Sequence, residues 1–326
     1  MKIGSLSAAW SAQPLTEVLD YFAKSGLQTI EIGSGGYPGN AHCDPAELNA
    51  DAAKREAFME AIASRGLELS ALSCHGNPLH PNKEVAAEFH KSWRDTVELA
   101  GKLGLECVVN FSGLPGGGPK DEFPNWVVAP WPEDHLKALE YQWDVAAEYW
   151  TQEAQVLKDA GLYVCFEMHP NFLVYNPETL LKLRRAVGAN GDRICANFDP
   201  SHLFWQGIDI PSALRWLGEE QDPVIRHFHA KDSLVYDWNA RVNGVLDTKH
   251  YGDEINRGWI FRTVGYGHGA EVWKDIISTL RMIGYDGTLS IEHEDSLMSS
   301  NEGFQKAIAF LKECVIFEDT GEMTWA

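Results

Sequence analysis

Apolar residues along this chain fall into short continuous runs that alternate with longer amphipathic stretches. Five of the runs follow a glycine that ends an amphipathic stretch, as after Gly104 and Gly161. Glycine tolerates the left-handed backbone conformation at the end of a helix, so it marks a turn from helix to strand. Continuous apolar strands separated by helices are typical of a parallel sheet that is covered on both faces.

Three further apolar runs lack the glycine but keep the same spacing. The eight predicted strands are residues 2–6, 27–32, 67–72, 105–110, 162–167, 193–199, 224–229 and 285–292. Eight such units in 326 residues predict an α/β chain that forms one closed (β/α)8 barrel domain over residues 1–326. An open doubly wound sheet usually carries a glycine-rich phosphate turn after its first strand, and Ser5-Leu-Ser-Ala-Ala-Trp stands there instead.

Two connections are longer than a barrel needs. One follows the fourth strand and contains Leu114-Pro-Gly-Gly-Gly-Pro, and the other covers about residues 233–268. Long connections in compact domains are usually lids, binding loops or interfaces. Both are predicted at the carboxyl ends of the strands, where barrel enzymes build their active sites.

Charge and composition exclude several classes of protein. The formal net charge is −20, whereas a protein that binds nucleic acid or an anionic membrane needs a basic surface. The six cysteines form no C-x-x-C pair, so we expect reduced, buried thiols. The N-terminal residues do not resemble a signal peptide, and no apolar run approaches the roughly 20 residues that span a bilayer. We therefore expect a cytoplasmic protein with a small-molecule substrate.

The last four predicted strands each end at an acid or a histidine, namely Glu167, Asp199, His229 and Glu292. Because the strands of a barrel converge on one mouth, these side chains are expected to meet. Three clustered carboxylates would repel one another unless a cation lies between them. Three oxygens and one imidazole suit Mn²⁺, Mg²⁺ or Co²⁺, and Zn²⁺ less strongly.

The residues two positions before these four share their faces of the strands. They are small or polar, as expected beneath a metal: Cys165, Asn197, His227 and Ser290. We expect Asn197 and His227 to hydrogen-bond the ligands. Each residue also has an ordinary alternative, since Asp199 before Pro-Ser is a good helix N-cap and a lone histidine is often a core residue. Four such endings on four successive strands favour a shared metal site.

These strand ends resemble the xylose isomerase-like barrel superfamily, in particular the sugar phosphate isomerase/epimerase family. The motifs are Phe166-Glu-Met-His-Pro, Asn197-Phe-Asp-Pro-Ser-His, His227-Phe-His-Ala-Lys-Asp and Ser290-Ile-Glu-His-Glu-Asp. The resemblance implies that Glu167, Asp199, His229 and Glu292 hold one divalent metal, with Mn²⁺ favoured. It also implies that His202 contacts the substrate.

The chain departs from the ketose 3-epimerases of that family in two places. They usually carry an arginine shortly after the seventh strand, where Lys231, Asp232 and the long insertion stand here. His169 follows the first metal glutamate, in a pattern that is similar to catalytic subunits of C-glycoside deglycosidases and to enzymes acting on 3-keto sugars. Ordinary alternatives are a structural hydrogen bond for His169 and an ion pair with Asp232 for Lys231.

The expected function is a metal-dependent sugar isomerase or epimerase that removes a proton next to a carbonyl through a metal-stabilised enediolate. The expected acid–base residues are Glu167, His169 and Glu292. The alternative is a lyase that eliminates the aglycone from a 3-keto glycoside. The residues expected to bind the substrate are His75, Asn110, His202, Trp205 and Lys231.

Tryptophan is frequent, with 12 residues, and four of them fall in predicted loops at the active face. Indole rings pack against sugar faces, although simple loop packing explains them equally well. These residues are Trp10, Trp126, Trp131 and Trp205.

The partner is expected to be a sugar or keto-sugar, and not a nucleic acid or a membrane. We expect a homo-oligomer and, for the lyase, a small second subunit. The superfamily also includes an apurinic endonuclease with a trinuclear zinc site, which the net charge of −20 disfavours. A non-catalytic carbohydrate-binding barrel is disfavoured by the intact set of candidate ligands.

Overall fold

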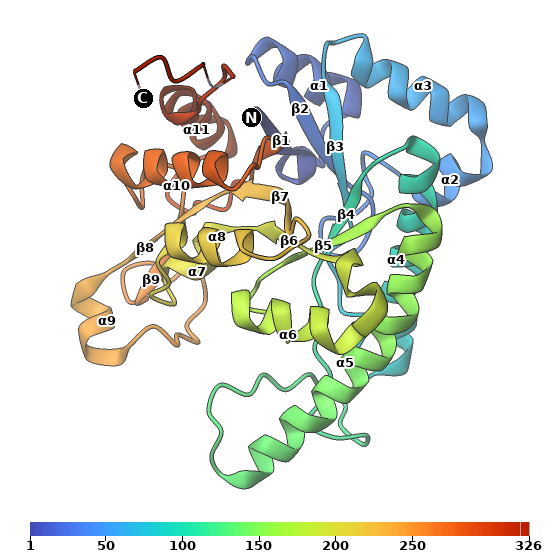
Figure 1. Ribbon diagram of the computed structural model, residues 1–326, viewed down its shortest axis with the longest axis vertical. Helices are drawn as coiled ribbons and strands as arrows, with labels where there is room; N and C mark the ends of the chain where they lie inside the picture. Colours follow the sequence, from blue (N-terminus) through green and yellow to red (C-terminus); the bar gives the residue numbers. More distant parts are fainter. Residues whose placement is uncertain (320, 326) are drawn as a thin grey trace.

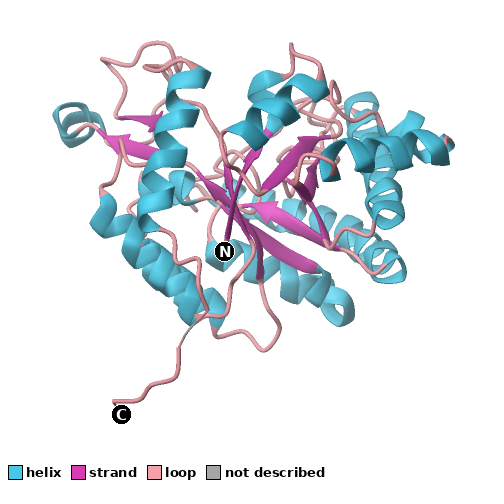
Figure 2. Ribbon diagram, turned by 90° about the horizontal axis from the view of Figure 1, so that it is seen from above, coloured by secondary structure: helices cyan, strands magenta, loops and turns pink. Residues whose placement is uncertain are grey.

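In the computed structural model, which describes residues 1–319 and 321–325, parallel strands close into a barrel. The order around the ring is β1, β10, β7, β6, β5, β4, β3, β2, and helices surround the strands (Figure 2). All eight predicted strands form, which confirms the (β/α)8 barrel. Their bounds are β1 Lys2–Leu6, β2 Thr29–Gly33, β3 Glu68–Ser73, β4 Cys107–Asn110, β5 Tyr163–Glu167, β6 Ile194–Phe198, β7 Ile225–Ala230 and β10 Thr288–Ile291.

Helices follow the strands and end where the sequence predicts. Gly104 and Gly161 have φ of 69° and 71° and cap α4 and α5 in the left-handed conformation. No helix in the described residues is long and apolar enough to cross a membrane. The helices are η1 Ser7–Trp10, α1 Leu15–Lys24, α2 Pro45–Ala50, α3 Ala52–Ala63, α4 Lys83–Leu103, α5 Glu133–Ala160, α6 Pro177–Val187, η2 Gly188–Arg193, α7 Pro200–Phe204, α8 Ile210–Gly218, α9 Asp237–Asn243, α10 Ala270–Met282 and α11 Ser300–Cys314.

Side chains inside the barrel change in character along its axis. A small apolar cluster that includes Val109, Cys165 and Cys195 fills one level. Two residues further along β5 and β6 stand Glu167 and Asn197, which are buried and polar. All six cysteines are buried and free, as expected from the sequence. The polar residues therefore gather at the carboxyl ends of the strands, next to a layer of apolar side chains in the barrel interior.

Two irregularities in strand pairing fall at this polar level. The register between β2 and β3 shifts between Ile30 and Glu31, and that between β6 and β7 shifts between Ala196 and Asn197. Such irregularities re-aim side chains and are frequent beside active sites. They occur where Glu31 and Asn197 turn into the barrel interior.

The insertion after β7 is partly regular rather than a simple loop. It holds an antiparallel pair, β8 (Asp232–Val235) and β9 (Trp259–Arg262), with α9 between the two strands. Figure 1 shows this unit standing beside the barrel, whereas the irregular connection 111–132 leads into the projecting start of α5.

Asp232 fastens the insertion to the barrel and is itself fully buried. Its Oδ2 accepts backbone N–H groups of Gly265, Gly267 and His268 at 2.9–3.2 Å and the indole N–H of Trp273 at 3.2 Å. The carboxylate thus joins the first residue of β8 to the segment that returns after β9. The suggested ion pair between Lys231 and Asp232 does not form, because Lys231 contacts other acids described below.

Replacing Asp232 with Asn should loosen the insertion, because an amide presents donors to a ring of N–H groups. Leaving such buried groups unpaired costs about 1–3 kcal/mol each, and we expect a loss of stability of at least about 2 kcal/mol. Denaturant unfolding and hydrogen exchange would measure this, with faster exchange in residues 233–268. Asp237→Asn, at an exposed i,i+4 pair with Arg241, is the matched control and should change little. Equal exchange in both variants would contradict this role.

Candidate active site

Four side chains meet at the carboxyl ends of β5, β6, β7 and β10. Glu167, Asp199, His229 and Glu292 each offer one ligand atom, and these atoms all lie within 4.8 Å of one another. Asp199 and His229 are fully buried, Glu167 is 2% exposed, and Glu292 is partly exposed. The barrel therefore brings together the four residues that the sequence singled out.

The two oxygens of Asp199 have different surroundings. Oδ1 accepts the backbone N–H of Ser201 at 2.7 Å and caps α7. Oδ2 is buried without a hydrogen-bond partner and faces the other three residues. Burial raises the pKa of Asp199 to about 6. His202 and Lys231 lie 3.4 and 3.8 Å from Oδ2, but neither forms a hydrogen bond with it, so it can accept a cation.

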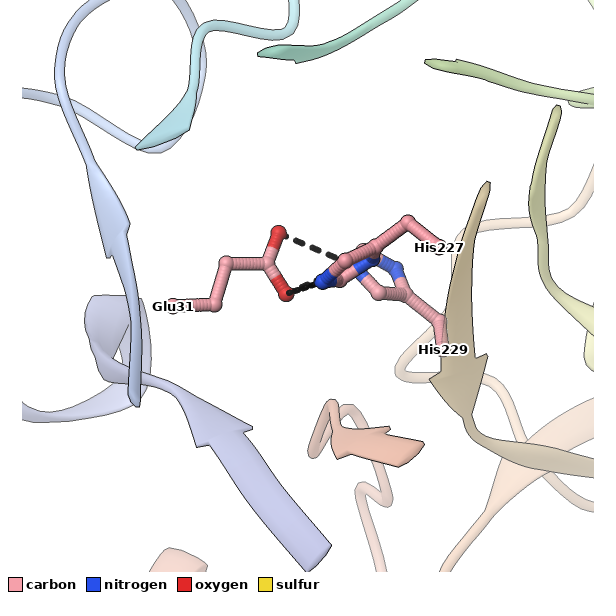
Figure 3. Close-up of side chains that lie close together, drawn as sticks. All are labelled: Glu31, His227 and His229. Atoms are coloured by element: carbon pink, nitrogen blue, oxygen red, sulfur yellow. Dashed lines mark hydrogen bonds and ion pairs between the residues drawn. The ribbon is translucent and has the colours of Figure 1, made fainter. Parts of the chain in front are cut away.

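His229 is held by a carboxylate that the sequence analysis did not single out. Its Nε2 lies 3.0 Å from both oxygens of Glu31, on β2 across the barrel (Figure 3). With Nε2–H donated to Glu31, Nδ1 points toward Oε2 of Glu167 at 3.0 Å and Oε2 of Glu292 at 3.2 Å, and forms no aligned hydrogen bond. A histidine ligand oriented by a carboxylate behind it is a common arrangement at metal sites.

The charges around His229 favour a positive charge at this position. Burial would lower the pKa of His229, but the carboxylates of Glu31 and Glu292 raise it well above its ordinary value. Without a cation, a proton on Nδ1 is therefore the way to balance the neighbouring carboxylates.

Glu31 accepts hydrogen bonds at both of its oxygens. Its oxygens accept from the hydroxyl groups of Ser73 and Ser290 as well as from His229. Burial would raise the pKa of Glu31, but the imidazoles of His229 and His227 hold it well below its usual range. Glu31, His227 and His229 could geometrically hold an ion, but the hydrogen bonds of Glu31 assign it to support instead. The available signal was an acidic residue inside the otherwise uncharged strand Thr29–Gly33.

Both oxygens of Glu167 are hydrogen-bonded. Oε1 lies 2.9 Å from Nε2 of His202, and Oε2 lies 3.0 Å from Nε2 of His75. Asn197 donates its Nδ2–H to Oε2 at 3.2 Å, and its own Oδ1 meets Nδ1 of His227 at 2.9 Å. Burial would raise the pKa of Glu167, but the hydrogen bonds from these histidines hold it well below its usual range. Asn197 forms a hydrogen bond with the candidate ligand Glu167, as expected, whereas His227 forms its hydrogen bond with Asn197.

Lys231 is a buried cation beside the same cluster. Its Nζ lies 3.1 Å from Oε2 of Glu292 and 3.8 Å from Oδ2 of Asp199, and it also pairs with Glu294. Burial would lower the pKa of Lys231, but Glu292 and Glu294 raise it well above its ordinary value. Burial would likewise raise the pKa of Glu292, which Lys231 and His229 lower to about 2. Lys231 therefore stays charged at neutral pH.

His169 stands next to the cluster with its ring centroid 4.0 Å from that of His202. Its Nδ1 contacts the carbonyl oxygen of Pro170, which is the structural bond considered as an alternative. Burial, with a further contribution from His202, lowers the pKa of His169 to about 3. The ring is therefore neutral at physiological pH, and Nε2 carries its lone pair.

Asn110 and Trp205, which were also expected to bind the substrate, both contact neighbouring parts of the protein. Asn110 uses its Oδ1 to accept the backbone N–H groups of Gly76 and Phe111, so this oxygen ties two loops together. Trp205 stacks on Trp259 with ring centroids 4.5 Å apart. Of the four tryptophans expected at the active face, Trp10 packs into the core and Trp131 is 80% exposed. Trp126 and Trp205 line a pocket together with His169 and His202, as a role in substrate binding requires.

The sequence also matches a known family over most of its length. Residues 19–314 match the family described as xylose isomerase-like TIM barrel. The chain belongs to this family. The family resemblance seen in the four strand-end motifs is thereby confirmed, while membership of the C-glycoside deglycosidase subgroup stays a prediction.

Individual proteins are similar to the chain in sequence or in structure. Uncharacterized protein YfiH of Bacillus subtilis (strain 168) is 39% identical over 323 residues, covering 97% of this chain and 99% of that protein. The probable 3-DHS dehydratase AsbF of Bacillus anthracis superposes with a TM-score of 0.65 at 17% identity, covering 96% and 99% of the two chains.

Two further solved structures share the barrel. The IolI protein with a binding zinc atom gives a TM-score of 0.65 at 17% identity, covering 97% of this chain and 98% of that one. D-psicose 3-epimerase in the presence of D-fructose gives 0.59 at 15% identity, covering 97% and 99%. At these identities the likeness shows the fold.

Replacing Glu31 with Gln should weaken divalent-cation binding without removing a ligand. The amide can donate to His229 as well as accept from it, so the imidazole loses its fixed tautomer, and such changes typically cost about 10–100-fold in metal affinity. Calorimetric titration of Mn²⁺ into metal-stripped protein would measure this. Glu153→Gln, a buried glutamate bonded to Trp93 on the outer layer, is the control. An unchanged affinity in the Glu31 variant would show that its carboxylate does not position His229.

Proposed function

We propose that this chain is a divalent-metal-dependent enzyme that moves a proton at a carbon next to the carbonyl of a sugar. The single observation behind this proposal is the mutual approach of Glu167, Asp199, His229 and Glu292 within 4.8 Å. Two of their atoms, Oδ2 of Asp199 and Nδ1 of His229, are buried and form no hydrogen bond, so they are suited to bind a cation. Three oxygens and one nitrogen favour Mn²⁺, with Mg²⁺, Co²⁺ and Zn²⁺ as alternatives.

The relatives support the same assignment. One solved neighbour is described with a zinc atom and another is a ketose 3-epimerase. A bound cation would supply Lewis-acid polarisation of the substrate carbonyl. The chain must then supply a base, a means to stabilise negative charge, and groups that orient the sugar.

Glu292 is the best-suited base of the two glutamates. Its contacts with His229 and Lys231 are made by Oε2, and within the described residues Oε1 accepts no hydrogen bond. It is also the most exposed of the four residues, with 16% of its side chain accessible. The side chain of Glu167 is only 3% exposed, so it is less accessible than Glu292 to a substrate proton, and its Oε1, which accepts one hydrogen bond, keeps a lone pair for a cation. The sequence predicted both glutamates as acid–base residues, and we assign proton transfer to Glu292 alone.

Lys231 and the two adjacent histidines complete the chemistry. The Lys231 ammonium can stabilise negative charge that develops on the substrate oxygen as the proton leaves. Neutral His169 can accept a hydrogen bond from a sugar hydroxyl at Nε2. The pKa values of His169 and Glu292 are both lowered, so the free Oε1 of Glu292 and its position among the four candidate ligands, rather than its basicity, are the reasons for choosing it as the base. Reprotonation at the same or the adjacent carbon gives epimerisation or isomerisation, whereas loss of a neighbouring group gives elimination.

The function is tested by solvent exchange and turnover. Protein loaded with Mn²⁺ should transfer deuterium from D2O into the carbon next to the carbonyl of a free ketose or of a 3-keto glucoside. Glu292→Gln should lower the exchange rate by at least about 100-fold, and a chelator should abolish exchange. Glu294→Gln, which also removes a partner of Lys231, is the control. Release of aglycone would assign elimination, and exchange that survives the chelator would refute the metal-dependent mechanism.

The affinity for the cation should rise with pH. In the metal-free protein the raised pKa of His229 keeps its proton through neutrality, and Asp199 takes up a proton below about pH 6. A cation must displace these protons. We expect Mn²⁺ affinity to increase about tenfold per pH unit above pH 6 and more steeply below it. Titrations between pH 5 and 8 in several buffers would test this, and a flat profile would count against His229 as a ligand.

A further inference from the structure

A chamber of about 270 Å³ lies beside the four candidate ligands, and three tryptophans and a tyrosine are among the residues that line it. Trp126 comes from the connection after β4, Trp205 from the end of α7, and Tyr251 and Trp259 from the insertion. We call this space the aromatic chamber. Its walls come mainly from segments that exceed what barrel closure requires.

The chamber adjoins the metal-binding residues without including them. His169 and His202 line it, whereas none of the four candidate ligands does. On its other side His202 reaches Oε1 of Glu167 at 2.9 Å. A substrate whose reacting carbonyl lies at the four ligands would therefore extend past these two histidines into the chamber.

Two donors in the chamber wall lack acceptors. The indole N–H groups of Trp126 and Trp205 are both buried without a hydrogen-bond partner. Trp205 is only 6% exposed and is fixed by its parallel stack on Trp259, with ring planes 5° apart. A buried donor without an acceptor is costly, so a ligand oxygen at either position would gain a hydrogen bond.

The chamber also lacks a positive charge for an anion. Among its lining residues, all of them described, there is no lysine or arginine. Its one carboxylate, Asp247, is neutralised by Lys249 at 2.8 Å and accepts the backbone N–H of Gly258 at 2.7 Å. Arg257 stacks on Tyr251 and Trp259 but does not line the chamber. It donates its N–H groups to the carbonyl oxygens of Trp259 and Lys249. A phosphate or carboxylate would therefore meet only neutral donors there, so its desolvation costs more than burying a neutral ring.

We propose that the aromatic chamber is a second subsite, which binds a neutral ring attached to the sugar. The substrate would then be an uncharged glycoside, with its keto-sugar at the four ligands and an aryl or second glycosyl ring among the tryptophans. Aromatic walls suit the flat faces of such rings, and the free indole N–H groups suit their oxygen substituents. The inference rests on the proposed function for the position of the reacting sugar.

Binding of three unreactive probes to Mn²⁺-loaded protein tests the subsite by calorimetry. Phenyl β-D-glucopyranoside should bind at least about tenfold more tightly than D-glucose, and 4-carboxyphenyl β-D-glucopyranoside about tenfold more weakly than the phenyl compound. Equal binding of phenyl glucoside and glucose, tighter binding of the carboxylated probe, or no binding of any probe would each overturn the proposal.

Two variants locate the effect in the chamber. Val128 lines the chamber and is 54% exposed, so Val128→Asp should fold and should reduce the preference for phenyl glucoside over glucose about tenfold. Val242→Asp, on α9 and 79% exposed outside the chamber, is the matched control and should leave the preference unchanged. Trp126→Phe keeps a ring but removes the N–H, and should reduce the preference about threefold or more. An unchanged preference in both chamber variants would refute the assignment.

Failure of the subsite and failure of the proposed function give different results. The preference for phenyl glucoside requires no turnover, so it is measured independently of the exchange reaction. If protein that never binds Mn²⁺ still prefers phenyl glucoside, the metal-dependent function fails and the chamber stands. If Mn²⁺ binds and ketose exchange proceeds without any preference, the chamber fails alone.

Discussion

Electrostatic repulsion among buried carboxylates is the constraint around which the mouth of the barrel is organised. Glu31, Glu167 and Asp199 are each at most 2% exposed, and Glu292 joins them at the edge. Removing several like charges from water together is unfavourable unless positive charge compensates them. The chain supplies Lys231 on one side and His229 in the middle. The remaining negative charge makes a divalent cation a natural third partner.

The same constraint explains why the two glutamates near His229 differ so much. Glu167 lies deep in the barrel, where His75, His202 and Asn197 form hydrogen bonds with its two oxygens. Glu292 lies at the rim, where Lys231 stabilises its charge but leaves one oxygen free. Both glutamates offer an oxygen to the candidate metal cluster, and Glu292 also has an accessible oxygen without a hydrogen bond. Position along the barrel axis thus distinguishes the buried candidate ligand Glu167 from the accessible candidate base Glu292.

The sequence predicts most of the barrel because each strand carries a local signal. Continuous apolar runs and helix-ending glycines such as Gly104 and Gly161 act over a few residues and need no tertiary information. The four strand-end residues were found because barrel closure places corresponding positions together. The role of Glu31 in orienting His229 was not predicted, because it depends on contacts with Ser290 and His229 that form only when the barrel closes. The chamber was not predicted for a similar reason. Its walls come largely from the two long connections, and their conformation cannot be read from a periodic pattern of apolar residues.

The division between strands and insertions has a mechanistic consequence. The candidate ligands stand on, or directly after, hydrogen-bonded barrel strands, so their separations are set by the rigid ring. The aromatic chamber is built by the connection after β4 and by the insertion that Asp232 ties down. Changes in these outer segments can alter which group fits beside His169 without moving the ligand atoms. Under the proposed function, reaction chemistry and substrate selection would depend on separate parts of the structure, which meet at His169 and His202.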